Sequence, residues 1–175
     1  MTLHRAFLVS VGVAAWITGC AVGPGAGAKA PAFTAVLDTG EKAQFESLMG
    51  ENGLILYFYP KDETPGCVKQ ACQFRDTLVD FTQRGYKVVG VSLDAPDVHK
   101  AFKEHHKLPF DLVSDPEKSI ATLYNVPVTT SAEGSVGFKR TTFVISKDGV
   151  IRRRFEVPDP LEQVTMAAEA IRQPF

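Results

Sequence analysis

Cysteine is scarce in this chain of 175 residues, which holds three. That number is too small for a fold held together by several disulfides. The chain also lacks an apolar run of about 20 residues, the length that a membrane-spanning helix requires. It has no basic excess either, because 19 Lys and Arg stand against 20 Asp and Glu, for a formal charge of −1. The sequence therefore gives no electrostatic case for nucleic-acid binding.

Apolar residues, by contrast, are plentiful at 45%, and 12 of the side chains are Phe. A chain of this length and composition is long enough to bury a full core as one globular domain.

The first 20 residues have the pattern of a bacterial lipoprotein signal. Arg5 gives a short basic start, and residues 6–17 carry no charge, as in the apolar region of a secretory signal. The string Ile17–Thr18–Gly19–Cys20 resembles the lipobox, in which the cysteine is acylated and becomes the new N-terminus. The resemblance implies a signal peptide at residues 1–19 and a lipid anchor on Cys20. The protein would then lie in the bacterial cell envelope, facing the periplasm or the exterior. A plain signal peptide or a short membrane anchor is the alternative.

Residues 21–30 hold three Gly, one Pro and no large side chain beyond Val22. Such a segment cannot build a core, so we expect residues 20–30 to form a flexible tether and residues 31–175 to form the domain. Within the domain, strands are expected at 33–37, 42–45, 54–59, 87–92, 110–113, 141–146 and 150–157, and helices at 67–84, 97–106, 114–124 and 160–172. The alternation of strands and helices indicates an α/β fold with a central mixed sheet flanked by helices. The closing hairpin and helix are typical of a thioredoxin-like fold.

Cys67 opens a predicted helix, directly after a loop of turn-forming residues. A helix N-terminus carries about half a positive charge and unpaired N–H groups, both of which stabilise a thiolate. Cys67 is therefore a candidate nucleophile. Cys72 follows five residues later, where an ideal helix places the two Cα atoms about 8.7 Å apart. A disulfide needs less than about 7 Å, so the pair can bridge only after a helical turn unwinds, which suits a catalytic or sensing pair better than a structural disulfide.

The sequence around Cys67 resembles the active site of the peroxiredoxins. Pro60–x–x–x–Thr64–x–x–Cys67 matches their signature. The string from Phe58 to Asp76, which includes Cys72, is similar to the peroxiredoxin Q branch, also called bacterioferritin comigratory protein. Further strings similar to that branch are Val91–Asp94, Leu112–Asp115, Tyr124–Val126 and Arg140–Ile145. The resemblance covers about residues 31–175 and implies a thioredoxin-like fold of the peroxiredoxin type.

The resemblance also implies what the two cysteines do. Cys67 would be the peroxidatic cysteine, whose thiolate attacks hydrogen peroxide or an organic hydroperoxide and becomes a sulfenic acid. Cys72 would be the resolving cysteine, which condenses with that sulfenic acid to an intramolecular disulfide. A thioredoxin-like thiol donor would then reduce the disulfide. No metal or other cofactor is implied, and the branch is often monomeric.

Four further residues would serve Cys67. Thr64 would hold the peroxide through its hydroxyl group, and the backbone N–H groups near Gly66 and Cys67 would stabilise charge on the departing oxygen. Pro60 would shield the thiolate from water. Arg140 would face Cys67 from a neighbouring strand, stabilise the thiolate and polarise the peroxide.

Two positions depart from the branch, since Val68 stands where Thr is frequent and Gln70 where Glu is frequent. Three other functions are alternatives to a peroxidase. A redox sensor could use the same cysteines without turnover. A metal-binding thioredoxin-fold protein, such as a copper chaperone, would need a later His, and none lies between Tyr124 and Phe175. A disulfide-exchange protein would need Cys-x-x-Cys, which is absent. We expect no metal site at His105 and His106, because adjacent rings diverge on a helix.

Overall fold

The structure is a computed structural model that describes residues 23–131 and 134–173. Seven strands form one mixed sheet in the order β2–β1–β5–β4–β3–β8–β9. Their bounds are Thr34–Leu37 (β1), Lys42–Gln44 (β2), Gly53–Phe58 (β3), Tyr86–Ser92 (β4), Asp111–Ser114 (β5), Thr141–Ser146 (β8) and Ile151–Phe155 (β9). The remaining elements are α1 (Pro65–Asp76), α2 (Leu78–Gln83), α3 (Pro96–His106), α4 (Ser119–Leu123), α5 (Pro160–Ala170), the 3-10 turn η1 (Phe45–Leu48) and the strands β6 (Val128–Thr130) and β7 (Val136–Phe138).

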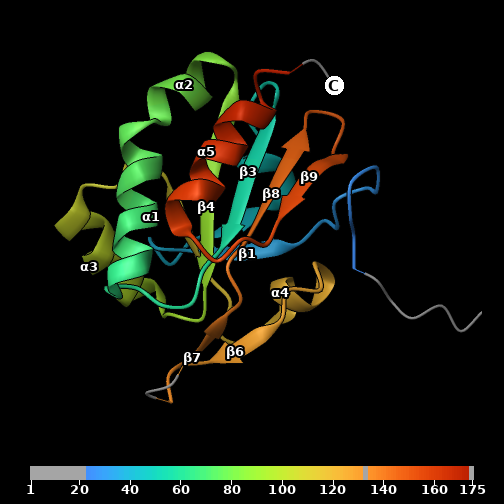
Figure 1. Cartoon of the computed structure of the whole chain (residues 1–175). Helices are drawn as coiled ribbons and strands as arrows, with labels where there is room; N and C mark the ends of the chain where they lie inside the picture. The colour runs from blue at the N-terminus through green and yellow to red at the C-terminus, as the bar shows by residue number, and fades with distance from the viewer. Residues whose placement is uncertain (1–22, 132–133, 174–175) are drawn as a thin grey trace, which may run out of the picture.

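Strand β3 lies at the centre, between parallel β4 and antiparallel β8. Its side chains alternate between two apolar clusters: Ile55 and Tyr57 pack with the face that α1 and α5 cover, and Leu54 and Leu56 pack with the face that α4 covers. Every residue of β3 is buried. The continuous apolar run therefore predicted correctly a strand that is covered on both sides. Figure 1 shows α1, α2 and α5 together on one side of the sheet.

The two predicted helices next to the site differ in detail from their prediction. The helix expected at 67–84 is divided at Thr77 into α1 and α2, and it begins earlier, at Pro65, because Thr64 is the N-cap. The helix expected from Ser114 begins at Ser119, after Lys118 in the left-handed region (φ 60°). Asp115 still caps that helix, since its carboxylate accepts the N–H of Ala121 at 2.9 Å.

Two features of the fold were not predicted. The β6–β7 hairpin forms a separate two-stranded sheet below the main sheet in Figure 1. The expected tether is also shorter than 20–30, because residues 27–30 hydrogen-bond to the turn between β8 and β9. The N–H of Gly27 donates to the carbonyl of Ile151, and that of Ala30 to Gly149, both at 2.8 Å. Residues 1–19 and Cys20 lie outside the described residues.

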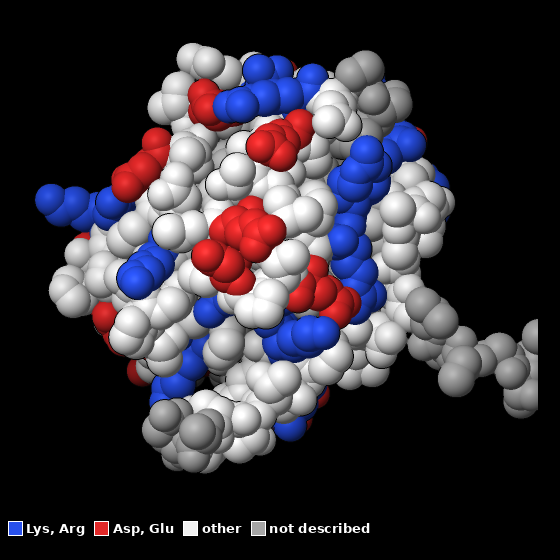
Figure 2. Space-filling model, in the orientation of Figure 1, with Lys and Arg blue, Asp and Glu red and all other residues white. Residues whose placement is uncertain are grey.

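Charges of both signs are interspersed over the face shown in Figure 2, as the near-zero formal charge leads one to expect. A column of basic side chains runs there beside β9, the strand that carries Arg152–Arg154. Among the described helices, none combines the length and apolar character needed to cross a bilayer.

Candidate active site

Cys67 sits in the first turn of α1, at the end of central strand β3. Thr64 has extended backbone angles (φ −78°, ψ 143°) and forms the N-cap, and Pro65 takes a first-turn position where its missing N–H costs nothing. The side chain of Cys67 turns inward and is 2% exposed. A buried sulfur therefore lies against the N–H groups of a helix start, a setting that favours thiolate.

Arg140 is the cationic partner of the Cys67 sulfur. It lies in the two-residue link between β7 and β8. Strand β8 pairs antiparallel with β3, so Thr141, the next residue, stands opposite Phe58, where β3 ends and the loop to α1 begins. The Nη2 atom of Arg140 is 3.5 Å from the sulfur of Cys67. A Cβ added to Gly66 would lie 3.3 Å from that same nitrogen. The predicted convergence of Arg140, Gly66 and Cys67 is thus present in the structure.

Two glutamines hold Arg140 in place. The other nitrogen of its guanidinium donates to the amide oxygen of Gln70. Gln163 of α5, fully buried, donates from Nε2 to the carbonyl of Arg140 at 3.0 Å and accepts from Thr142 Oγ1 at 2.6 Å. Gln70 is therefore a neutral partner for Arg140, which leaves the full positive charge of Arg140 facing the sulfur.

Thr64 and Pro60 line a cavity of about 480 Å³ beside the helix start, together with residues of β6 and β7. The hydroxyl of Thr64 donates to the carbonyl of Lys61 at 2.9 Å, so its oxygen can still accept a hydrogen bond from a ligand. A Cβ on Gly137 would come within 2.3 Å of the carbonyl oxygen of Pro60. Only glycine lets β7 lie this close to the active-site loop.

Cys72 lies on the same unbroken helix as Cys67, half-buried, and both cysteines are free thiols. Its thiol lies against Arg75, whose pKa is raised above its ordinary value, mainly by the hydrogen bond to Asp76 and also by Cys72. Arg75 forms a local ion pair with Asp76 at 2.8 Å. In the first turn of α1, Pro65 is exposed and Gly66 is half-buried, whereas Cys67 packs in the apolar cluster under α1, so unwinding this turn has to withdraw Cys67 from that cluster.

The loop between β3 and α1 is anchored by a buried polar cluster that sequence reasoning missed. Asp62 Oδ2 lies 2.7 Å from His99 Nδ1, and Asp62 Oδ1 accepts from Tyr59 at 2.7 Å. His99 Nε2 lies 3.2 Å from the carbonyl of Val113. The ring of His99 is thus held at both nitrogens, and His99 and Asp62 form a buried hydrogen-bonded pair.

The sequence did contain weak signals for these supporting residues. Asp62 lies inside the signature string, and Gln163 is a polar residue on the inner face of an amphipathic helix. However, Asp62 lies 37 residues from its partner His99, and Gln163 lies 23 residues from its partner Arg140. No rule of sequence spacing connects residues so far apart.

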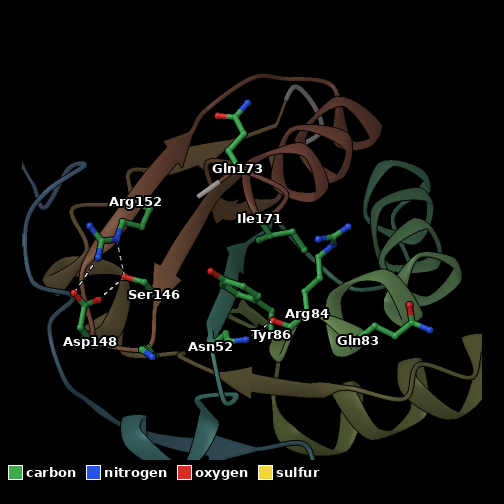
Figure 3. Close-up of a pocket in the computed structure, with 10 residues that line it drawn as sticks. Asn52, Gln83, Arg84, Tyr86, Ser146, Asp148, Arg152, Ile171 and Gln173 are labelled. Carbon is green, nitrogen blue, oxygen red and sulfur yellow. Dashed lines mark hydrogen bonds and ion pairs between the residues drawn. The ribbon is translucent and has the colours of Figure 1, made fainter. Parts of the chain in front are cut away.

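A larger cavity, about 560 Å³, lies at the opposite end of the sheet, near the starts of β3 and β4. Figure 3 shows Tyr86, Ser146 and Arg152 at its wall, with the side chains of Ser146 and Asp148 around Arg152. Within the described residues, no cysteine lines it. No described cysteine lines the cavity beside Thr64 either, but Thr64 and Pro65 on its wall begin the helix that carries Cys67. The cavity beside Thr64 is for this reason the better candidate for substrate, although it is smaller.

The metal-binding alternative finds no support at the cysteines. In the part of the chain that the structure describes, the one group of side chains that converges as metal ligands consists of Glu63, His105 and His106. Neither Cys67 nor Cys72 belongs to it.

Comparison with known proteins connects this geometry to a family. The sequence profile described as "AhpC/TSA family" matches residues 26–154. The peroxiredoxin bcp of Coxiella burnetii is 44% identical over 127 residues, which cover 71% of this chain and 83% of that protein. The Peroxiredoxin Bcp of Bacillus subtilis is 35% identical over 148 residues, covering 83% and 94%. Among solved structures, Peroxidoxin BcpB from Mycobacterium tuberculosis superposes with a TM-score of 0.78 at 27% identity, covering 85% of this chain and 97% of that one.

Proposed function

The chain belongs to the AhpC/TSA family of peroxiredoxins, in its Bcp and peroxiredoxin Q branch, and from this premise we propose that it reduces hydroperoxides through Cys67 and Cys72. Membership of the family implies a thiol peroxidase with a peroxide substrate and a thiol reductant. The observation that supports the assignment to Cys67 is its buried sulfur, 3.5 Å from the guanidinium of Arg140 at a helix start.

In the first step the thiolate of Cys67 attacks the terminal oxygen of the peroxide. A sulfur–oxygen bond forms, the oxygen–oxygen bond breaks, and the departing alkoxide or hydroxide takes up a proton. Cys67 leaves this step as a sulfenic acid. Arg140 and the N–H groups of Gly66 and Cys67 would stabilise charge on the departing oxygen, and Thr64 would accept a hydrogen bond from the peroxide. Pro60, on the wall of the same cavity, would limit the access of water.

In the second step the thiol of Cys72 attacks the sulfenic sulfur, a disulfide forms, and water leaves. Because the ideal-helix separation exceeds disulfide reach, the first turn of α1 must open before this step. A dithiol donor of the thioredoxin type would then reduce the disulfide by exchange and become oxidised itself. No metal or organic cofactor is required in this sequence, and a monomer contains every group that takes part.

The test is the intact mass of the reduced protein after one equivalent of hydrogen peroxide. We expect a rapid loss of two hydrogen atoms, which peptide mapping assigns to a Cys67–Cys72 disulfide. The Cys67→Ser variant is the matched control and should not react rapidly. Rapid oxidation of that variant would overturn the assignment, and disulfide formation without catalytic turnover with any dithiol donor would favour the redox sensor instead.

We also propose that Cys20 carries a lipid anchor that holds the protein in the bacterial cell envelope, facing the periplasm or the exterior. The support is the lipobox pattern at residues 17–20 and the absence of a large side chain between Cys20 and the folded domain other than Val22. Expression of the whole chain in bacteria with labelled fatty acid should label the protein, and Cys20→Ala should lose the label and the membrane fraction. Membrane attachment that survives this substitution would disprove the anchor.

A further inference from the structure

The carboxylate of Glu63 lies between two adjacent imidazoles. Its Oε1 atom is 3.0 Å from Nδ1 of His105, and its Oε2 atom is 3.0 Å from Nε2 of His106. The ring centroids of the two histidines are only 4.3 Å apart. The expectation that these rings diverge is therefore wrong. His105 contacts the carboxylate through Nδ1, and His106 contacts it through Nε2, so both rings reach Glu63.

The three groups come from two segments, the active-site loop before α1 and the end of α3. His105 and His106 end α3, where the carbonyl end of the helix dipole favours a cation. Glu63 lies in the loop before α1, one residue from the N-cap Thr64, and its backbone is in the left-handed region (φ 57°). Contacts with both imidazoles fix the carboxylate of Glu63 between the two rings.

We propose that Glu63, His105 and His106 form a binding site for a divalent transition-metal ion of the zinc class. One oxygen and two nitrogen atoms of this set lie within 4.8 Å of one another. Zinc bonds of about 2.0–2.2 Å in a tetrahedron place neighbouring ligand atoms about 3.3 Å apart, close to the observed nitrogen–oxygen distances of 3.0 Å. Two imidazoles and one carboxylate are ligands that zinc prefers, and they leave a fourth position for water.

Two cations of neighbouring segments are engaged by acids. Lys103 lies 2.9 Å from Asp38, and Arg75 pairs with Asp76. His106 is largely covered, with a side-chain exposure of 16%, whereas His105 at 70% and Glu63 at 48% leave an open path for the ion. A bound ion would tie the loop before Cys67 to the end of α3. The site stands on this geometry alone and does not depend on peroxidase activity.

Calorimetric titration with zinc chloride at neutral pH tests the proposal. The protein is the untagged full chain with all three cysteines replaced by serine, so that no thiolate can bind the metal. We expect one zinc ion per chain with micromolar affinity. His106→Gln and Glu63→Gln each remove one proposed ligand. Each should raise the Kd for zinc by about tenfold or more, which is about 1.4 kcal/mol of binding free energy. X-ray absorption of the complex should show two nitrogen ligands and oxygen at about 2.0–2.2 Å.

Glu104→Gln is the matched control, because, like Glu63→Gln, it removes one negative charge, here from the last turn of α3 beside His105, without removing a proposed ligand. Its affinity for zinc should equal that of the parent chain. Absence of saturable zinc binding would overturn the proposal. Equal affinity in the parent, Glu63→Gln and His106→Gln chains would also overturn it, since it would place the metal elsewhere.

Discussion

Replacement of His99 by leucine should destabilise the protein by about 1–3 kcal/mol, the cost of leaving a buried polar group without its hydrogen-bond partner. The size of the loss follows from burial, because the side chains of His99 and Asp62 are 0% and 1% exposed. Leucine is close to His in volume, so the main effect is the lost hydrogen bond to Asp62. Tyr59 still donates to Oδ1 of Asp62, but Oδ2, the oxygen that contacts His99, loses that partner.

Urea unfolding of the reduced protein, followed by circular dichroism, measures this cost. A double-variant cycle makes the test specific: Asp62→Ala removes the carboxylate in the parent and in the His99→Leu background. Since the double variant leaves neither partner of the pair behind, its loss of stability should be smaller than the sum of the two single losses by about 0.5–3 kcal/mol. Additive losses, or a loss of less than about 1 kcal/mol for His99→Leu, would refute the contact between Asp62 and His99 as the anchor of this loop.

Three further outcomes follow from the site. Arg140→Lys keeps the charge but loses the planar fork that contacts both Cys67 and Gln70, so stopped-flow oxidation by hydrogen peroxide should slow by about 100-fold; an unchanged rate would show that charge alone is sufficient. Cys72→Ala should consume one equivalent of peroxide and then gain further oxygen at Cys67 on the mass spectrum, whereas normal cycling with a dithiol donor would exclude Cys72 as the resolving group. Among the described residues, the hydroxyl of Tyr57 is buried without a hydrogen-bond partner, so Tyr57→Phe should raise the free energy of unfolding by about 1 kcal/mol in urea titration; a loss of stability would contradict this.

The parts of the fold that sequence predicted well are those in which local pattern and tertiary environment agree. The apolar run at 54–59 became the central strand because both faces of the sheet are covered, and the Asp-Gly turn after Ser146 joined β8 to β9. The β6–β7 hairpin was missed because its strands have three residues each and most of their side chains are exposed, so no hydrophobic period marks them.

Some residues of the candidate site could likewise be predicted from the sequence, and others could not. Cys67 and Arg140 could be found because a signature string and a resemblance point to each of them. The residues that hold Arg140 could not, since Gln70 and Gln163 meet it only through the packing of α1, α5 and β8. At Gln70 a neutral amide stands in place of the Glu that is frequent in the branch. In the structure it is the direct partner of Arg140.

The path of residues 23–30 sets an orientation for the whole molecule. Lys29 pairs with Val150, and before it the chain runs back along the domain toward α4 (Figure 1). A Cβ added to Gly23 would lie 2.0 Å from the Cβ of Asn125, which follows α4. Two residues lie between Cys20 and Gly23, a reach of at most about 11 Å. In a chain held by lipid at Cys20, the bilayer would lie near α4, which packs on the face of the sheet opposite α1. The helix that carries Cys67 would then face away from lipid, toward soluble reductants.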